Sequence, residues 1–226
     1  MYSGQEKEKH IWQTCKIEAL NTPGNRTPLK IMKQLLNICV VSFFLIIPSQ
    51  ANDISEFQIG GINLGESLLN YVNEEKIKRI MKTDYPNSKK FSRIVIKLPD
   101  VKDYSNIMFH FKTNDKKYII HSISGQIGYR ESFEQCLSNK EKISLDVSEV
   151  FLNSNLKKVK SRKKHALDNE SIVDNEYFFF PNGGFIEIGC YDWSKKIEEK
   201  LNYTDHLKVA INSEEFDKFL TNEAFK

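Results

Sequence analysis

The sequence lacks the short motifs that mark the common classes of catalytic site. It contains no G-x-S-x-G, no H-E-x-x-H, no phosphate-binding P-loop and no paired C-x-x-C. None of these motifs therefore assigns a reaction class to the chain. Cysteine is scarce, with four in 226 residues. The main apolar run, 35–47, is shorter than the about 20 residues that a membrane-spanning helix needs.

The apolar run nevertheless has the surroundings of a signal peptide. Lys33 supplies a positive charge before it, and Leu35 to Ile47 are interrupted only by Asn37 and Ser42. Pro48 ends the run, and the following Ser-Gln-Ala at 49–51 fits the small-x-small pattern of signal peptidase sites. We therefore predict a signal peptide over residues 32–51 and no stable membrane span after its cleavage.

Residues 1–31 show scattered charge and no apolar periodicity. We interpret them as a mis-called or extended leader, with translation beginning at Met32. The alternative is a cytoplasmic tail on a membrane anchor. Cys39 is preceded by Ile38, whereas a lipoprotein cysteine needs a small residue before it, so we expect no lipid anchor there.

Removing the leader changes the charge of the chain. The whole sequence has 33 Lys and Arg against 30 Asp and Glu, but residues 52–226 keep 27 of each. The excess positive charge belongs to the leader, so net charge gives no argument for nucleic-acid binding. The remaining 175 residues suit a single domain, or two joined halves.

Residues 52–226 retain two cysteines, Cys136 and Cys190. In an oxidising compartment an even number of widely spaced cysteines predicts a disulfide. The alternative is a catalytic thiol at Cys190, which would need a free thiol and a nearby base. Export favours the disulfide.

Strand and helix patterns alternate along the chain after residue 52. Two short helical patterns precede strands over 91–98, 107–111 and 118–129, and the latter two form a predicted hairpin. A helix over about 132–151, a hairpin over 177–193, a strand at 207–211 and a closing helix follow. This order predicts an α+β fold with a mainly antiparallel sheet and helices packed on one face.

The segment 153–176 is polar, with a basic run over 157–164 followed by acidic residues. It is a candidate patch for an anionic surface. We favour a solvated loop whose charges are neutralised by their neighbours.

The hairpin over 177–193 is rich in aromatic residues on both sides of the turn Pro-Asn-Gly-Gly. Alternation sends about half of these side chains to each face of the sheet. An uncovered face would leave an aromatic patch of the kind that partner surfaces carry. The candidate binding residues are Tyr177, Phe179, Tyr191 and Trp193; if helices cover both faces, they belong to the core.

Polar candidates are fewer. Asp192, Asp205 and His206 could supply an acid and a base to a hydrolase with a site near Tyr191, although no nucleophile occurs at a recognisable spacing. We interpret them as turn and strand-edge residues. His110 and His121 could share a face of the first hairpin, depending on its loop length, as part of a zinc site, but no third ligand is evident. We therefore predict no metal site and no cofactor.

Three stretches carry a resemblance: 59–69, the Cys-Tyr-Asp-Trp of 190–193, and 203–209. Together they resemble a family of uncharacterised small exported bacterial proteins. The element order over 57–130 is also similar to the fold shared by β-lactamase inhibitor proteins and small outer-membrane-assembly lipoproteins. This chain lacks the lipoprotein cysteine, and neither resemblance implies an activity.

We therefore expect a periplasmic or secreted binding protein that contacts a protein partner or another envelope component. A hydrolase and a structural envelope protein are the alternatives. Converging polar and titratable side chains in a concave pocket would discriminate between them.

We predict cleavage after Ala51. N-terminal sequencing of the exported protein should begin at Asn52, because signal peptidase accepts the preceding Ser-Gln-Ala. A membrane-bound product that retains residues 1–51 would contradict this prediction.

Overall fold

The computed structural model describes residues 53–83, 85–129 and 132–225. Contacts divide the chain into Met1–Pro48 and Ser49–Lys226, and all described residues belong to the second unit. The predicted leader and signal peptide, 1–51, lie outside the described residues. Within the described ranges, no helix is long and apolar enough to cross a bilayer.

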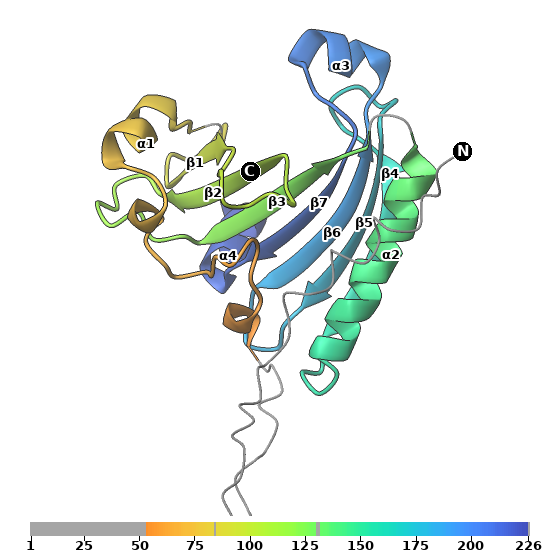
Figure 1. Cartoon of the computed structure of the whole chain (residues 1–226), viewed down its shortest axis with the longest axis horizontal. Helices are drawn as coiled ribbons and strands as arrows, with labels where there is room; N and C mark the ends of the chain where they lie inside the picture. The colour runs from red at the N-terminus through yellow and green to blue at the C-terminus, as the bar shows by residue number, and fades with distance from the viewer. Residues whose placement is uncertain (1–52, 84, 130–131, 226) are drawn as a thin grey trace, which may run out of the picture. The chain divides into compact units, whose positions relative to one another are not determined.

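The described chain folds into a seven-stranded sheet whose neighbouring strands are all antiparallel (Figure 1). The predicted α+β class with an antiparallel sheet is confirmed. The strands are β1 (Phe91–Ile96), β2 (Asn106–Lys112), β3 (Ser122–Gly128), β4 (Lys157–Lys164), β5 (Ile172–Phe179), β6 (Phe185–Asp192) and β7 (His206–Asn212). The helices are α1 (Glu74–Ile80), α2 (Phe133–Val150), α3 (Lys195–Leu201) and α4 (Glu214–Asn222), with short 3-10 helices at Ile54–Glu56 and Leu68–Asn70.

The order of strands across the sheet is β1-β2-β3-β7-β6-β5-β4. The strands β1 to β3 form one antiparallel meander and β4 to β6 form another. The last strand of the chain, β7, lies between β3 and β6 and pairs with both. It therefore joins the two meanders into one continuous sheet.

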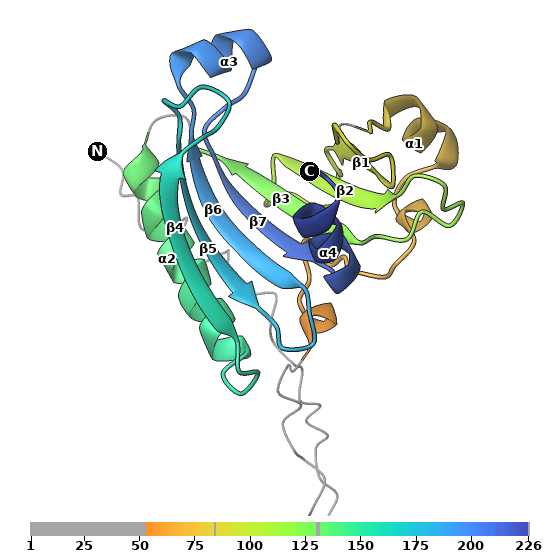
Figure 2. The same ribbon diagram turned by 180° about the vertical axis from the view of Figure 1, so that it is seen from behind.

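One face of the sheet carries the main hydrophobic core. Ile186, Ile188 and Cys190 of β6 are fully buried there, together with alternate residues of β1, β2, β3 and β7. The helix α2 and the segment 53–81 supply the other side of this core. Figures 1 and 2 show α2 on this face, in front of the sheet in one view and behind it in the other.

The helix α4 packs on the opposite face, so the helices are not confined to one face as predicted. Phe91 of β1 and His110 of β2 project to that face, where Phe216 and Phe219 of α4 cover them. The ring centroids of Phe91 and Phe219 are 4.8 Å apart, and those of His110 and Phe216 are 4.6 Å apart. Burying these rings requires a helix on the second face.

The helix α2 begins at the predicted cap, because the hydroxyl of Ser132 accepts a hydrogen bond from the backbone N–H of Gln135 at 3.2 Å. Its buried positions are Cys136, Lys140, Ser144 and Val147, which follow helical spacing. The two polar members face carboxylates of β5: Lys140 pairs with Asp174, and Ser144 donates a hydrogen bond of 2.6 Å to Glu176.

The basic run that we interpreted as part of a loop is the edge strand β4. Its side chains are mostly exposed on both faces, so no apolar alternation is present to reveal a strand. Two of its cations reach acids of β5. Lys158 lies 2.7 Å from Glu176, and Arg162 lies 3.7 Å from Asp174.

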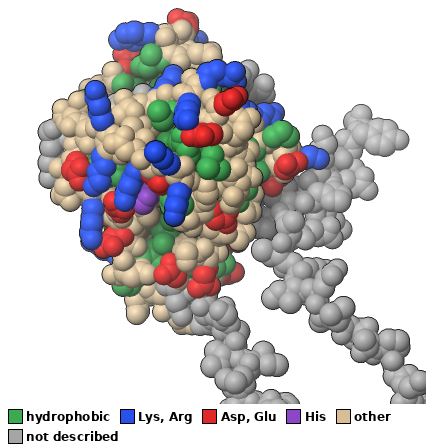
Figure 3. Space-filling model, turned by 90° about the vertical axis from the view of Figure 1, so that its left-hand side faces the viewer, with side chains coloured by type: hydrophobic (Ala, Val, Ile, Leu, Met, Phe, Trp, Pro, Cys, Tyr) green, Lys and Arg blue, Asp and Glu red, His purple; other side chains and the backbone are tan. Residues whose placement is uncertain are grey.

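On the side of the protein that bears α1, cations and anions are interspersed (Figure 3).

The predicted disulfide is confirmed. Cys136 of α2 and Cys190 of β6 are bonded, with their Cα atoms 6.0 Å apart. The bond ties the long helix to the sheet across the main core.

We predict that the double variant Cys136→Ala/Cys190→Ala is less stable by about 4 kcal/mol, because the disulfide constrains a long loop in the unfolded chain. The two cysteines are 54 residues apart in sequence. Urea unfolding of the parent and variant measures the difference. A reducing agent should destabilise the parent by a similar amount and leave the variant unchanged. Two cysteines that react with a thiol reagent in the native exported protein would contradict the bond.

Candidate functional site

The sheet face opposite α2 bears a cleft of about 440 Å³. This volume lies within the range of about 300–1,000 Å³ that is typical of small-molecule sites. Residues of β1, β2, β3, β6 and β7 line its floor, and the segment between α3 and β7 forms one wall. Figure 2 shows the course of these strands, with α3 beyond the end of β6. The lining residues are Arg93, Val95, Asn106, Met108, Gln126, Tyr191, Trp193, Asn202, Tyr203, Thr204, His206 and Lys208.

Strand register brings the floor residues together. Asn106 is opposite Gln126, and Gln126 is opposite Lys208, so these side chains form a polar row across β2, β3 and β7. The row continues to Gly189 of β6. A Cβ at that position would collide with the side-chain oxygen of Asn175 on β5, so glycine leaves the space that this amide occupies.

A buried network around Glu187 lies on the same face of the sheet as the cleft. Its carboxylate accepts hydrogen bonds from Lys208 at 2.8 Å, from the hydroxyl of Tyr191 at 3.0 Å and from the amide of Asn175 at 3.1 Å. Burial alone would lower the pKa of Lys208, but the adjacent carboxylate outweighs burial and raises that pKa. Lys208 therefore stays charged and is unsuited to act as a neutral nucleophile.

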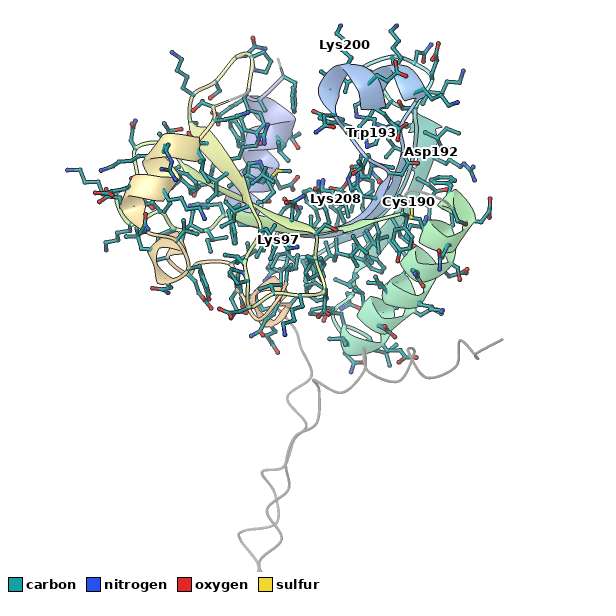
Figure 4. The ribbon with its side chains drawn as sticks, turned by 45° about the horizontal axis from the view of Figure 1, so that its top comes forward. Lys97, Cys190, Asp192, Trp193, Lys200 and Lys208 are labelled. Carbon is teal, nitrogen blue, oxygen red and sulfur yellow. A yellow bond between two sulfur atoms is a disulfide. The ribbon has the colours of Figure 1, made fainter. Side chains whose placement is uncertain are left out.

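Four rings form the aromatic wall, which we define as Tyr191, Trp193, Tyr203 and His206. Tyr191 stacks on His206 at 4.8 Å, and Trp193 stacks on Tyr191 at 5.6 Å. Tyr203 meets Trp193 edge to face at 5.0 Å. Trp193 is buried, whereas Tyr203 is 41% exposed at the rim. Figure 4 shows Trp193 between α3 and the sheet, and Lys208 on the floor.

His206 is held as a neutral ring. Burial lowers its pKa below the usual range, and the charge of Lys208 acts in the same direction. Its Nδ1 lies 2.8 Å from the carbonyl oxygen of Thr204, which can only accept a hydrogen bond. Nδ1 therefore carries the proton, and Nε2 is left as an acceptor facing the side-chain nitrogen of Gln126 at 3.5 Å.

Two acids hold the aromatic wall in position. Asp205 accepts a hydrogen bond from the backbone N–H of Trp193 at 2.7 Å, and burial raises the pKa of Asp205. Asp168, in the turn between β4 and β5, accepts hydrogen bonds from the hydroxyls of Ser171 and Ser194. Ser194 is the N-cap of α3. Desolvation would raise the pKa of Asp168, but these hydrogen bonds outweigh it and lower that pKa.

The aromatic candidates from the sequence lie on the face that bears the cleft. Tyr191 and Trp193 line it. Tyr177 and Phe179 project from β5 to the same face, where they form a second cluster with Phe185 at ring distances of 5.5–6.0 Å. All four predicted aromatic residues therefore lie on the face that bears the cleft, and two of them line it.

The polar candidates from the sequence, Asp192, Asp205 and His206, do not all face the cleft. His206 lies directly opposite Tyr191, so both face the cleft, whereas the next residue, Asp192, projects to the other face. Asp205 is occupied with the backbone of Trp193. The acid and base of the hydrolase alternative therefore do not converge.

His110 and His121 also lie away from the cleft lining. The register pairs His110 with Ser122, so the two histidines are not opposite each other in the hairpin. His110 packs under α4, and the Nδ1 of His121 lies 3.7 Å from a carboxylate oxygen of Glu215. No group of three or more potential metal ligands occurs among the described residues.

Sequence analysis did not select most of the cleft. Arg93, Asn106, Gln126, Tyr203 and Lys208 each lie in unremarkable polar or strand contexts. For Lys208 the sequence gives one indication of its position. Leu207, Val209 and Ile211 alternate along the last strand, which places Lys208 on the opposite face of the sheet.

Comparison of the chain with protein-family models, with curated proteins and with solved structures finds no match. The resemblances noted from the sequence stay predictions.

We predict that acid weakens the protein partly through His110. Burial, and then the charges of Lys208 and Arg93, lower its pKa to about 3, so the unfolded chain binds a proton below about pH 6.5 while the folded chain does not. The unfolding free energy should fall as pH falls between these values, by up to about 1.4 kcal/mol per pH unit from this residue.

The variant His110→Phe keeps an aromatic ring under α4 and removes the titration. Urea unfolding at a series of pH values should give a shallower acid slope for the variant than for the parent. Equal slopes would show that His110 is not buried in its neutral form.

Proposed function

We propose that this protein is an exported binding protein and that the cleft is its ligand site. The observation that carries the proposal is the joining of an aromatic wall to a polar floor around one concave volume. Small-molecule sites combine apolar and aromatic surface with a few polar groups that fix orientation.

Export is proposed on separate grounds. The sequence predicts a signal peptide over 32–51, and the disulfide between Cys136 and Cys190 favours an oxidising compartment. We place the protein in the periplasm or outside the cell, where its ligand would be a component of the envelope.

Binding is favoured over hydrolysis because the reactive groups near the cleft are engaged with one another. Burial raises the pKa of Tyr191, and its hydroxyl already donates to Glu187. Asp192 and His206 project to opposite faces. A buried ion pair often contributes no more to folding stability than apolar residues of similar volume would contribute in its place. The network of Glu187 and Lys208 is better explained by a role at a site.

Tryptophan fluorescence tests this proposal. The chain has two tryptophans, and Trp12→Phe leaves Trp193 as the sole reporter whether or not the leader is cleaved. Titration with fractionated bacterial envelope extract should change its emission in a saturable way. Tyr203→Ala at the rim should weaken the response about tenfold, which corresponds to about 1.4 kcal/mol for a lost aromatic contact.

Tyr71→Ala is the matched control, because Tyr71 is a comparably exposed tyrosine that does not line the cleft. It should bind as the parent does. The absence of a saturable change with every fraction would reject the cleft as a ligand site. Turnover of a bound component would favour the hydrolase.

A further inference from the structure

The two edges of the sheet differ in how their backbones are covered. At one edge, the backbone of Lys82 exchanges hydrogen bonds of 2.9 and 2.8 Å with that of Arg93 in β1. At the other edge β4 pairs with β5 along its whole length, and no other described segment bonds to the backbone of β4 (Figure 2). Alternate backbone groups of an edge strand point away from its neighbour, so the edge at β4 is open to another strand.

The side chains along this open edge are cationic. Every residue of β4 except Ser161 is exposed. Lys158 and Lys160 lie 2.7 and 3.9 Å from a carboxylate oxygen of Glu176, and Arg162 lies near Asp174. The other three cations, Lys157, Lys163 and Lys164, have no carboxylate within 4 Å among the described residues. The edge therefore carries positive charge that its own neighbours do not pair.

The paired cations lie on one face of β4. Lys158 and Arg162 point toward α2, where Lys158 donates to the hydroxyl of Ser144 and Arg162 lies over a ring of that helix. Lys157 and Lys163 project to the other face, in register with Phe179 and Val173 of β5. They are six residues apart in sequence, or about 20 Å along a strand.

An apolar position lies between these two lysines on the same face. Val159 is 36% exposed and is opposite Tyr177 of β5. The ring of Tyr177 stacks on that of Phe179 at 6.0 Å, so the apolar surface continues onto the neighbouring strand. The open face of β4 thus presents a cation, a valine, a serine and a second cation.

We propose that β4 is the docking strand for an acidic, extended peptide segment of a partner protein. The segment adds to the sheet as an eighth strand, and its backbone bonds to the open edge of β4. Two carboxylates six residues apart pair with Lys157 and Lys163, and an apolar residue between them contacts Val159. The surface lies outside the cleft, so the inference does not depend on the ligand site proposed above.

The open backbone favours a peptide over other anions. An anionic lipid head group or polysaccharide can neutralise the cations, but it lacks the alternating N–H and C=O groups that pair with an edge strand. A second copy of this chain would offer its other edge strand, β1, which has no acidic residue. The occupant that matches both the backbone and the charge is an acidic strand.

The test uses the full chain and a synthetic peptide of about ten residues, with two glutamates six residues apart and valines between them. Hydrogen exchange of backbone amides is followed by mass spectrometry at peptide concentrations up to about 1 mM. The peptide should slow exchange saturably in residues 157–164 and leave β1 unchanged, because a newly paired N–H exchanges more slowly.

Two control peptides separate the backbone from the charge. A peptide that is methylated at its backbone nitrogens keeps both glutamates but has no N–H group to donate. It should bind about tenfold or more weakly. A peptide with lysines in place of the two glutamates should not bind, because like charges at opposed positions repel. These comparisons use the unaltered protein.

Lys157→Gln/Lys163→Gln should weaken binding of the glutamate peptide about fivefold, as expected for the loss of two exposed ion pairs. Lys116→Gln/Lys117→Gln is the matched control, because these exposed lysines lie in the turn after β2, across the sheet from β4. It should bind as the parent does.

Equal binding of the glutamate peptide and its methylated form overturns strand addition. Slowed exchange that falls only outside residues 157–164 overturns the assignment to β4. Tighter binding of phosphatidylglycerol vesicles or of alginate than of the peptide, with slowed exchange in residues 157–164, overturns it in favour of a membrane or a polysaccharide. An unchanged exchange pattern at the highest peptide concentration overturns it outright.

Discussion

The pairing of β6 with β7 determines what each face of the sheet presents. Cys190 lies opposite Leu207, and Tyr191 lies opposite His206. The first pair faces the main core, where the disulfide fixes α2, and the second pair faces the cleft. A slip of one residue would exchange the faces and place a charged lysine and a carboxylate in the core. The core and the cleft therefore depend on the same register.

The small size of one residue, Gly189, determines how side chains pack on the cleft face. Gly189 is opposite Lys208 of β7 and has no side chain, which leaves room for the side chain of Asn175. The amide of Asn175 can therefore reach Glu187. Each polar group of this network is expensive to bury without its partners. Glu187 accepts three hydrogen bonds in this network, whereas the buried side-chain oxygen of Asn175 has no hydrogen-bond partner.

Local pattern was sufficient for much of the fold. The aromatic hairpin, the strand predicted at 207–211 and the cap of α2 follow from signals within short windows, and the disulfide follows from the count of cysteines after the leader. The first predicted hairpin is present as β2 and β3, but its second strand begins at Ser122 and not at Tyr118, because residues 118–120 do not pair with β2. They bond instead to the segment before α1, with Leu68 donating to Tyr118 at 3.0 Å and Gly65 donating to Ile120 at 2.9 Å. No pattern inside the hairpin reveals a partner so distant in the sequence.

The candidate site was predictable only in its aromatic part. Tyr191 and Trp193 stand out because aromatic residues cluster around a clear turn, whereas Arg93, Gln126 and Lys208 become neighbours only through the strand order β1-β2-β3-β7. That order depends on the last strand inserting between two meanders, which is a long-range choice. The assembly of the polar floor therefore could not be obtained from spacing.

The basic edge strand β4 has a consequence for the association of copies. An open sheet ends in unpaired backbone groups that can pair with the edge of another chain. Two β4 edges brought together would place Lys157, Lys163 and their neighbours opposite one another, and like charges at opposed positions repel. Repulsion between these cations disfavours pairing of two β4 edges. The repulsion does not depend on a ligand, because no residue of β4 lines the cleft.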